Sequence, residues 1–286
     1  MDSIIGSRVM KLVDLALGVK GKIIEVEFED WSGVLRKARI PDDQLWGAVR
    51  SILLLEENEM IYPFKPKNMD IVIDAGAAHG LYALKVSGEA KKVIAIEAHP
   101  WNCKLLLENV SRNRLQKKIL VLHAALCGRN VPVTLFEAKD TVSHNIFGGS
   151  GRKILVSPIT LREIINRYGD VDLMKMDIEG AEFEVLLTAE DKILKRIDKM
   201  VIELHPQIYG RIGITEIINK LRKVGFNNIT LAKPAILQPY SYTIRKVSET
   251  HLKNLRTLKF LLLFYPIGRL LKIRELPNLI VYARST

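Results

Sequence analysis

The sequence predicts an α/β protein: a mostly parallel β-sheet with helices on both of its faces. Short apolar runs bounded by turns, such as Ile71–Ile73 and Val93–Ile96, are typical of strands buried on both sides. Segments with helical spacing of apolar residues stand between these runs, and this alternation is typical of parallel sheets. The chain has 286 residues, of which 48% are hydrophobic and 26% charged. This composition supports a large core and excludes a disordered or low-complexity protein.

Residues 1–66 are predicted to form an N-terminal extension. Apolar residues at helical spacing predict its first helix, and alternation of apolar with charged residues on both sides of Trp31-Ser-Gly33 predicts a β-hairpin. The segment Pro63-Phe-Lys-Pro66 is typical of a linker. In order, the expected elements are a helix over 3–17, strands at Lys22–Glu29 and Val34–Ile40, and a helix over Asp42–Leu55.

Residues 67–286 are predicted to form the second domain, in which strands and helices alternate. Its strands are expected at Asp70–Asp74, Val93–Glu97, Ile119–Leu126, Val171–Asp177, Met200–His205, Phe226–Leu231 and Leu279–Tyr282. Its helices are expected at Leu81–Val86, Trp101–Asn113, Ala181–Leu187 and Thr215–Val224. A basic helical insertion at about 238–276 separates the last two strands.

The balance of charge is basic, with 43 Lys and Arg residues against 32 Asp and Glu residues and a net charge of +11. Such a surplus favours acidic partners, for example nucleic acid or anionic lipid, and a solvated lysine-rich surface is an equal alternative. Residues 245–274 hold eight Lys and Arg residues against Glu249, with leucines at helical spacing. This segment could lie on an anionic membrane surface, bind an acidic acceptor, form a dimer or cover the core.

Two cysteines and the lack of zinc-type spacing favour a reducing compartment. Charged residues among the first 20 interrupt any signal-peptide core. The apolar run Phe260–Ile267 is far shorter than the roughly 20 residues of a membrane-spanning helix. We therefore expect a cytoplasmic protein, peripheral to the membrane if the basic segment binds lipid.

Acidic residues and histidines follow several of the predicted strands, where a parallel sheet binds its ligand. The first turn, Asp74 to Gly80, lacks a dinucleotide fingerprint because Asp74 and His79 stand where glycines are needed. A carboxylate there would repel a pyrophosphate but suits a ligand that carries an ammonium group, such as S-adenosylmethionine. Glu97 follows 23 residues after Asp74, near the offset at which an acidic side chain accepts hydrogen bonds from ribose hydroxyls.

Three segments carry a resemblance to a known family. Val72–Gly80 and Ala95–Pro100 resemble class I S-adenosylmethionine-dependent methyltransferases, and Asp172–Glu182, with its Lys-Met-Asp-Ile-Glu-Gly-Ala-Glu string, is similar to the signature of the FkbM family. The resemblance implies a Rossmann-like class I methyltransferase sheet of seven strands, mostly parallel with the last strand antiparallel. It also implies O-methylation, often of hydroxyls on sugars or natural products.

The resemblance further implies a set of cofactor-binding positions. These are Asp74, Gly76, Ala78, His79, Gly80, Glu97, Ala98, Ala124 and Asp177. The chain departs from the family by having His79 in place of Asn and Ala98 in place of Pro. It also lacks the acid that many class I enzymes carry near Ala124 for the adenine amino group, so a backbone carbonyl would serve there.

Transfer of a methyl group to a hydroxyl needs alignment of the reactants and a base that removes the hydroxyl proton. The candidates for this base are His205, then Asp177, then Glu179, with His205 first because of its unperturbed pKa. Each candidate could instead be structural, as a packed histidine or as an acid that stabilises the first turn of a helix. Lys175 lies in an apolar strand and needs a buried partner, for which Asp74 or Asp177 is the natural candidate. The spacing of these residues demands no metal ion.

Three functional hypotheses remain open. The first is O-methylation of a sugar, a lipid-linked glycan or a small metabolite. The second is methylation of tRNA or another nucleic acid, because Glu97–Pro100 with Asn109 and Asn113 resembles archaeal tRNA guanine methyltransferases. The third is a non-catalytic module that binds S-adenosylmethionine or a membrane. The sequence leaves the oligomeric state undetermined.

Overall fold

The computed structural model describes residues 23–42, 44, 52, 64–137, 147–148, 151–232 and 279–285. The helix expected over 3–17, most of the helix over 42–55 and the basic insertion at 238–276 lie outside the described residues. The membrane contact considered for that insertion therefore stays a prediction.

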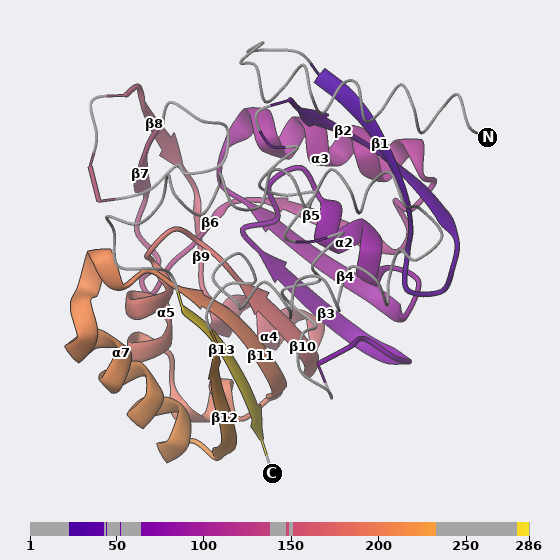
Figure 1. The fold of residues 1–286 in the computed structure, drawn as a ribbon. Coiled ribbons are helices and arrows are strands. Elements are labelled where there is room, and N and C mark those ends of the chain that lie inside the picture. Colours follow the sequence, from indigo (N-terminus) through magenta and orange to yellow (C-terminus); the bar gives the residue numbers. More distant parts are fainter. Residues whose placement is uncertain are drawn as a thin grey trace, which may run out of the picture.

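A seven-stranded sheet forms the centre of the molecule (Figure 1), with the strand order β12-β13-β11-β10-β3-β4-β5. The strands pair in parallel except β13, which is antiparallel to both of its neighbours. This topology confirms the fold predicted from the sequence. The strands are β3 Met69–Ala75, β4 Ala90–Glu97, β5 Ile119–His123, β10 Val171–Met176, β11 Ile197–Leu204, β12 Phe226–Ala232 and β13 Leu279–Ser285.

Side chains alternate between the two faces of this sheet, so each strand contributes to two apolar cores. Val72 packs with the face covered by two helices, α2 Leu81–Val86 and α3 Pro100–Arg112. Its neighbour Ile73 packs on the opposite face. The helices of that second face are α4 Leu161–Tyr168, α5 Glu182–Thr188, α6 Asp191–Leu194 and α7 Pro206–Lys223.

The predicted N-terminal hairpin is present as β1 Ile23–Glu29 and β2 Leu35–Pro41, which pair antiparallel. Its second strand packs on α3, and the buried side chain of Asn109 joins the two. The Asn109 Oδ1 accepts from the backbone N–H of Arg39 at 2.7 Å, and its Nδ2 donates to the carbonyl oxygens of Arg39 and His79 at 2.9 and 2.8 Å. The hairpin is thus tied to the turn that follows β3, and a domain boundary at residue 66 stays a prediction.

Several elements differ from the sequence prediction. The strand expected over Ile119–Leu126 ends at His123, because Ala125 leaves the main sheet and its N–H donates to the Ser157 carbonyl at 2.9 Å. Residues 125–126 instead form β6 Ala125–Leu126, paired with β9 Pro158–Ile159. A further hairpin, β7 Val133–Phe136 with β8 Lys153–Val156, was not predicted.

Two helices also differ from the prediction. Helix α4 was not expected, although Thr160 and Glu163 form a capping box at its start. Helix α7 begins at Pro206 instead of Thr215 and contains a non-helical residue, Gly210, with φ of 66°. None of the helices within the described ranges is both long enough and apolar enough to cross a membrane.

Two adjacent leucines of α3 test this packing. Leu106 is fully buried against the sheet, whereas Leu107 is 52% exposed. We expect Leu106→Ala to lower the free energy of unfolding by about 2–5 kcal/mol and Leu107→Ala to change it by less than about 0.5 kcal/mol. Denaturant unfolding followed by circular dichroism measures both values. Equal losses for the two variants would contradict the orientation of α3.

Candidate functional site

The turn after β3 lies in direct backbone contact with the residues that follow β10. The N–H of Asp177 donates to the carbonyl oxygen of Ala75 at 3.0 Å. Gly76 has φ of +74°, and a Cβ added there would lie 1.7 Å from the Asp177 carbonyl oxygen. Only glycine therefore fits at this position, and the first turn and the Asp177 segment are fixed against one another.

Lys175 lies beneath this contact with only 6% of its surface exposed. Its Nζ donates to the Gly76 carbonyl at 2.9 Å and lies 3.5 Å from Asp74 Oδ1 and 3.7 Å from Asp177 Oδ2. The lysine thus contacts both partners that the sequence offered. Burial lowers the pKa of Lys175, but the two carboxylates outweigh this and raise it. Burial also raises the pKa of Asp74 to about 6, against the opposing effect of Lys175.

Glu97 lies beside the same turn at the end of β4. Its Oε2 accepts from the N–H of Ala78 and its Oε1 from the N–H of His99, both at 2.8 Å. The side chain is largely buried, and this burial raises the pKa of Glu97 while the two N–H groups lower it. Because a carboxylate oxygen has two lone pairs, Glu97 retains capacity for further donors such as ribose hydroxyls.

The other predicted cofactor positions surround Glu97 mainly through their backbone. The N–H of Ala124 donates to the Glu97 carbonyl at 3.1 Å, and the Ala98 carbonyl accepts from His123 Nε2 at 3.1 Å. The side chain of His79 is buried toward α3, where its Nε2 lies 3.2 Å from Asn102 Oδ1. A ligand at the strand ends would therefore meet the backbone of residue 79, not its imidazole.

Gly80 starts α2 in the left-handed conformation, with φ of 84°. A Cβ there would lie 2.3 Å from Leu106 Cδ1 of α3. Glycine at this position allows α3 to pack closely against the first turn.

A second cluster of charges lies where β10 and β11 end. His205 is 2% exposed, and its Nε2 is 3.4 Å from Glu179 Oε2 and 3.9 Å from Asp177 Oδ1. The structure therefore brings together the three residues that were candidates for the base. Glu203 belongs to the same cluster, since donor atoms of Asp177, Glu203 and His205 all lie within 4.8 Å of one another.

The concentration of carboxylates shifts the ionisation of this cluster. Burial alone would lower the pKa of His205, but Glu182, Asp177 and Glu179 raise it to about 10. Burial and the charge of Asp177 raise the pKa of Glu179 to about 8, although His205 opposes this shift. By these shifts His205 keeps its proton at neutral pH, and Glu179 becomes a carboxylate only as the pH rises through about 8.

Glu182 belongs to this cluster although it was not among the predicted site residues. It is fully buried, and its Oε1 accepts from the N–H of Ile178 at 2.8 Å and lies 3.2 Å from His205 Nδ1. Tyr209 was also missed: its hydroxyl oxygen accepts from the His205 N–H at 2.7 Å, and its ring stacks on Phe183. The residues Glu182 and Tyr209 fix the position of His205 from two sides.

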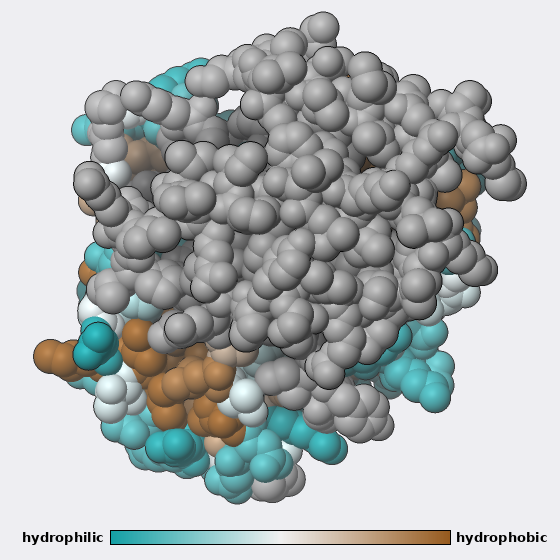
Figure 2. Space-filling view, in the orientation of Figure 1, coloured by the Kyte–Doolittle hydropathy of each residue, from teal (hydrophilic) through white to brown (hydrophobic). Residues whose placement is uncertain are grey.

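Apolar side chains flank the acidic cluster at the turn between β10 and α5. Glu179 is left-handed with φ of 54°, and a Cβ at the following Gly180 would lie 2.2 Å from Ile208 Cδ1 and 2.8 Å from Phe147 Cε2. Ile208 is 39% and Phe147 54% exposed. Figure 2 shows hydrophobic residues gathered on the α7 side of the molecule. The charged residues are therefore bordered by an apolar surface.

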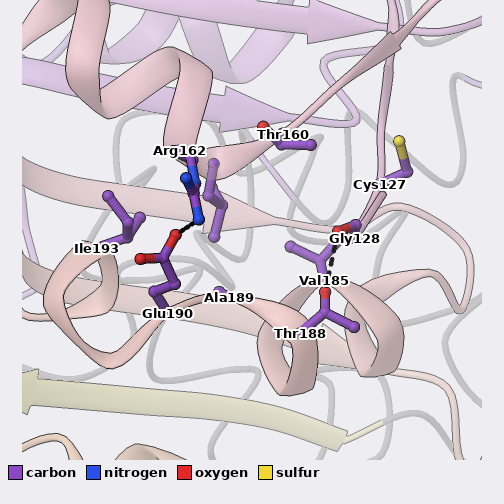
Figure 3. Close-up of a pocket in the computed structure, with 10 residues that line it drawn as sticks. Cys127, Gly128, Thr160, Arg162, Val185, Thr188, Ala189, Glu190 and Ile193 are labelled. Carbon is purple, nitrogen blue, oxygen red and sulfur yellow. Dashed lines mark hydrogen bonds and ion pairs between the residues drawn. The ribbon is translucent and has the colours of Figure 1, made fainter. Parts of the chain in front are cut away.

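A cavity of about 110 Å³ lies elsewhere, between α4, α5 and α6 (Figure 3). An ion pair between Arg162 and Glu190 borders it, and the Thr188 hydroxyl donates to the Gly128 carbonyl at 3.2 Å. None of the predicted site residues lines this cavity. It is therefore separate from the charged groups at the strand ends.

Comparison with known proteins gives one family match. The family model described as "Methyltransferase FkbM domain" matches residues 74–227, more than half of the chain. A search of curated proteins gives no match.

Two solved structures illustrate the likeness in fold. One is methyltransferase FkbM from Methylobacillus flagellatus KT, with 17% identity, 64% of this chain and 44% of that chain covered, and a TM-score of 0.42. This chain thus matches less than half the length of that protein. The other is M. jannaschii TYW2 in complex with AdoMet, with 16% identity, 94% and 90% coverage, and a TM-score of 0.43. These distant likenesses carry no argument about function. The function is inferred from the family match and from the geometry of the site.

Two glycines with the same backbone conformation test the contact between the first turn and Asp177. Gly76→Ala adds a clash with the Asp177 carbonyl, whereas Gly33→Ala meets no atom within 4 Å at φ of +81°. We expect Gly33→Ala to cost about 1–2 kcal/mol of unfolding free energy from backbone strain alone, and Gly76→Ala to cost clearly more. Denaturant unfolding compares the two variants. Equal losses would show that the clash is relieved without cost and that the close approach is not needed.

Proposed function

The chain belongs to the FkbM methyltransferase family, and on that premise we propose that it methylates a hydroxyl group with S-adenosylmethionine as donor. The acceptor would be a sugar, a lipid-linked glycan or a small metabolite. The observation that carries the proposal is the meeting of two charged groups at one turn. The turn donates to Glu97 through the N–H of Ala78, and its Gly76 packs against the backbone of Asp177, which belongs to the cluster with Glu179 and His205.

The turn after β3 and Glu97 would hold the cofactor. Two carboxylates, Asp74 and Glu97, stand where a phosphate-bearing nucleotide would need donors, and this favours a nucleoside that carries a positive charge instead. Asp74 is fully buried, and neither of its carboxylate oxygens is hydrogen-bonded to a residue within the described ranges. It would therefore act through Lys175 and the backbone of the turn. When bound, S-adenosylmethionine would supply the methyl group as an electrophilic carbon on a sulfonium.

Glu179 is the residue that we propose as the base. Its side chain is 31% exposed, whereas His205 is enclosed and both of its ring nitrogens already face carboxylates. Asp177 Oδ2 lies 3.7 Å from Lys175 Nζ and is already paired with that cation. In its ionised form, which its raised pKa of about 8 favours at mildly alkaline pH, Glu179 would take the hydroxyl proton as the oxygen forms its bond to the methyl carbon and the carbon–sulfur bond breaks.

The surroundings of Glu179 support an uncharged acceptor with an apolar face. Phe147 and Ile208 are partly exposed beside Gly180, and they would pack against such a molecule. The carboxylates of Asp177 and Glu179 would repel the phosphates of a nucleic acid. Nucleic-acid methylation therefore stays the second candidate, with the net charge of +11 in its favour.

Removal of the charge of Glu97 tests the cofactor side. We expect Glu97→Gln to weaken S-adenosylmethionine binding roughly 10- to 100-fold, because hydrogen bonds to a charged acceptor contribute about 1.5–3 kcal/mol. Isothermal titration calorimetry measures this, with thermal unfolding to confirm that the variant is folded. Glu108→Gln on the outer part of α3 is the control and should bind as the wild type does. An unchanged affinity in folded Glu97→Gln would contradict the assignment of this pocket.

Replacement of the base tests the acceptor side. We expect Glu179→Gln to lower turnover by about 10²- to 10⁴-fold, because that is the contribution of a general base, and to leave cofactor affinity unchanged. Turnover is measured as transfer of a labelled methyl group. Glu184→Gln, two residues into α5 and partly exposed, is the matched control. Full turnover in Glu179→Gln would exclude this residue as the base.

The class of acceptor can be identified with the same label. The protein is incubated with a cell extract and labelled S-adenosylmethionine, and the products are separated into RNA, lipid, glycan and small molecules. We expect the label in the glycan, lipid or small-molecule fraction. Label in RNA would favour the nucleic-acid alternative instead.

A further inference from the structure

We propose that Asp177, Glu203 and His205 form a binding site for one divalent transition-metal ion. Each residue would supply one donor atom: two carboxylate oxygens and an imidazole nitrogen. Such a mixed set suits ions that accept both nitrogen and oxygen ligands, for which Mn²⁺ is a suitable probe.

The three donors already lie close to the spacing that an ion requires. Their ligand atoms are all within 4.8 Å of one another, and His205 Nε2 is 3.9 Å from Asp177 Oδ1. Three ligands bonded at roughly 2.0–2.2 Å and spread evenly around an ion lie about 3.5–3.8 Å apart. Donor atoms at the 4.8 Å limit would each need to move inward by less than about 1 Å to complete the site.

The far side of His205 has the arrangement found around metal-binding histidines. Such a histidine directs its second ring nitrogen at a carboxylate or carbonyl, which fixes the tautomer and the orientation of the ring. Here Nδ1 lies 3.2 Å from Oε1 of Glu182, which is fully buried and is itself held by the N–H of Ile178. Nε2 of the 2%-exposed His205 faces Glu179 Oε2 at 3.4 Å and Asp177 Oδ1 at 3.9 Å, away from bulk water.

The charge of the cluster also favours a cation. Asp177, Glu179, Glu182 and Glu203 meet around one largely buried histidine. Lys175 contacts Asp177, but it also pairs with Asp74. Carboxylates removed from water need compensating charge, and a divalent ion would supply it.

The topology explains why the sequence spacing does not disclose such a site. Asp177 directly follows β10, Glu203 lies in β11, and His205 directly follows β11. Because β10 and β11 are adjacent and parallel, residues 26 positions apart in the chain reach the same edge of the sheet. No local motif records this meeting.

The ion would keep open positions on the side of Glu179, which is partly exposed. In a role that presupposes the proposed function, the acceptor hydroxyl oxygen would bind there, and the ion would make its proton easier to remove. Glu179 would still receive that proton.

Ion binding can be tested without cofactor or acceptor. The full-length protein is treated with a chelator, desalted and titrated with Mn²⁺, and the free ion is followed by electron paramagnetic resonance. We expect about one Mn²⁺ per chain. Asp177→Asn and Glu203→Gln each remove a ligand, and Glu182→Gln removes the carboxylate that faces His205 Nδ1. Each variant should bind Mn²⁺ at least about 10-fold more weakly. Glu184→Gln on the same helix should bind as the wild type does.

The wild-type protein provides a readout that needs no variant. Spin-echo modulation of bound Mn²⁺ should show coupling to one imidazole nitrogen. The proposal is overturned by no binding up to about 1 mM Mn²⁺, by bound Mn²⁺ without nitrogen coupling, or by unchanged affinity in folded Asp177→Asn and Glu203→Gln. Since S-adenosylmethionine is absent, these outcomes leave the methyltransferase proposal to be decided by the Glu97 and Glu179 variants.

Discussion

The burial of one ammonium group, that of Lys175, is the constraint on which the site depends. Transfer of such a group from water costs several kcal/mol, so it is stable only with partners in fixed positions. Those partners are Asp74, the Gly76 carbonyl and Asp177, which belong to the ends of two adjacent strands. The ammonium group of Lys175 therefore sets the distance between two turns. One would hold the cofactor, and the other carries the acids on the proposed acceptor side.

The central sheet could be predicted because its strands are buried on both faces and leave apolar runs with clear ends. The sequence could not show where a strand changes partner. Ile119–Leu126 is continuous in hydrophobicity, yet the chain leaves the sheet after His123 because the backbone of Ala125 pairs with residue 157. The β7–β8 hairpin joins segments separated by a long polar stretch, which no short-range turn signal indicates. Helix α4, by contrast, has a signal in the sequence itself, because Thr160 and Glu163 form a capping box at its start.

The site was predictable in its composition but not in its packing. Parallel strands bring their carboxyl ends to one edge, so the meeting of Asp177 with His205 follows from topology. The topology does not determine, however, whether an acidic side chain on a helix faces the site or the solvent. Glu182 and Glu184 both belong to the first turn of α5, yet the former is fully buried beside His205 and the latter is partly exposed. Likewise, the buried contacts of Asn109 with the hairpin depend on the angle at which α3 packs against β2. The spacing of apolar residues along the helix does not specify that angle.

The position of β13 has a consequence for synthesis on the ribosome. This strand lies between β11 and β12, so the edge of β11 that faces it has no sheet partner until residues 279–285 have been made. An unpaired edge invites association with other chains, and pairing across such a separation is slow. Glu203 and His205 therefore reach their final setting late in translation. A nascent chain that stalls before this point would expose the strand that carries Glu203, with its edge open to pairing with other extended segments.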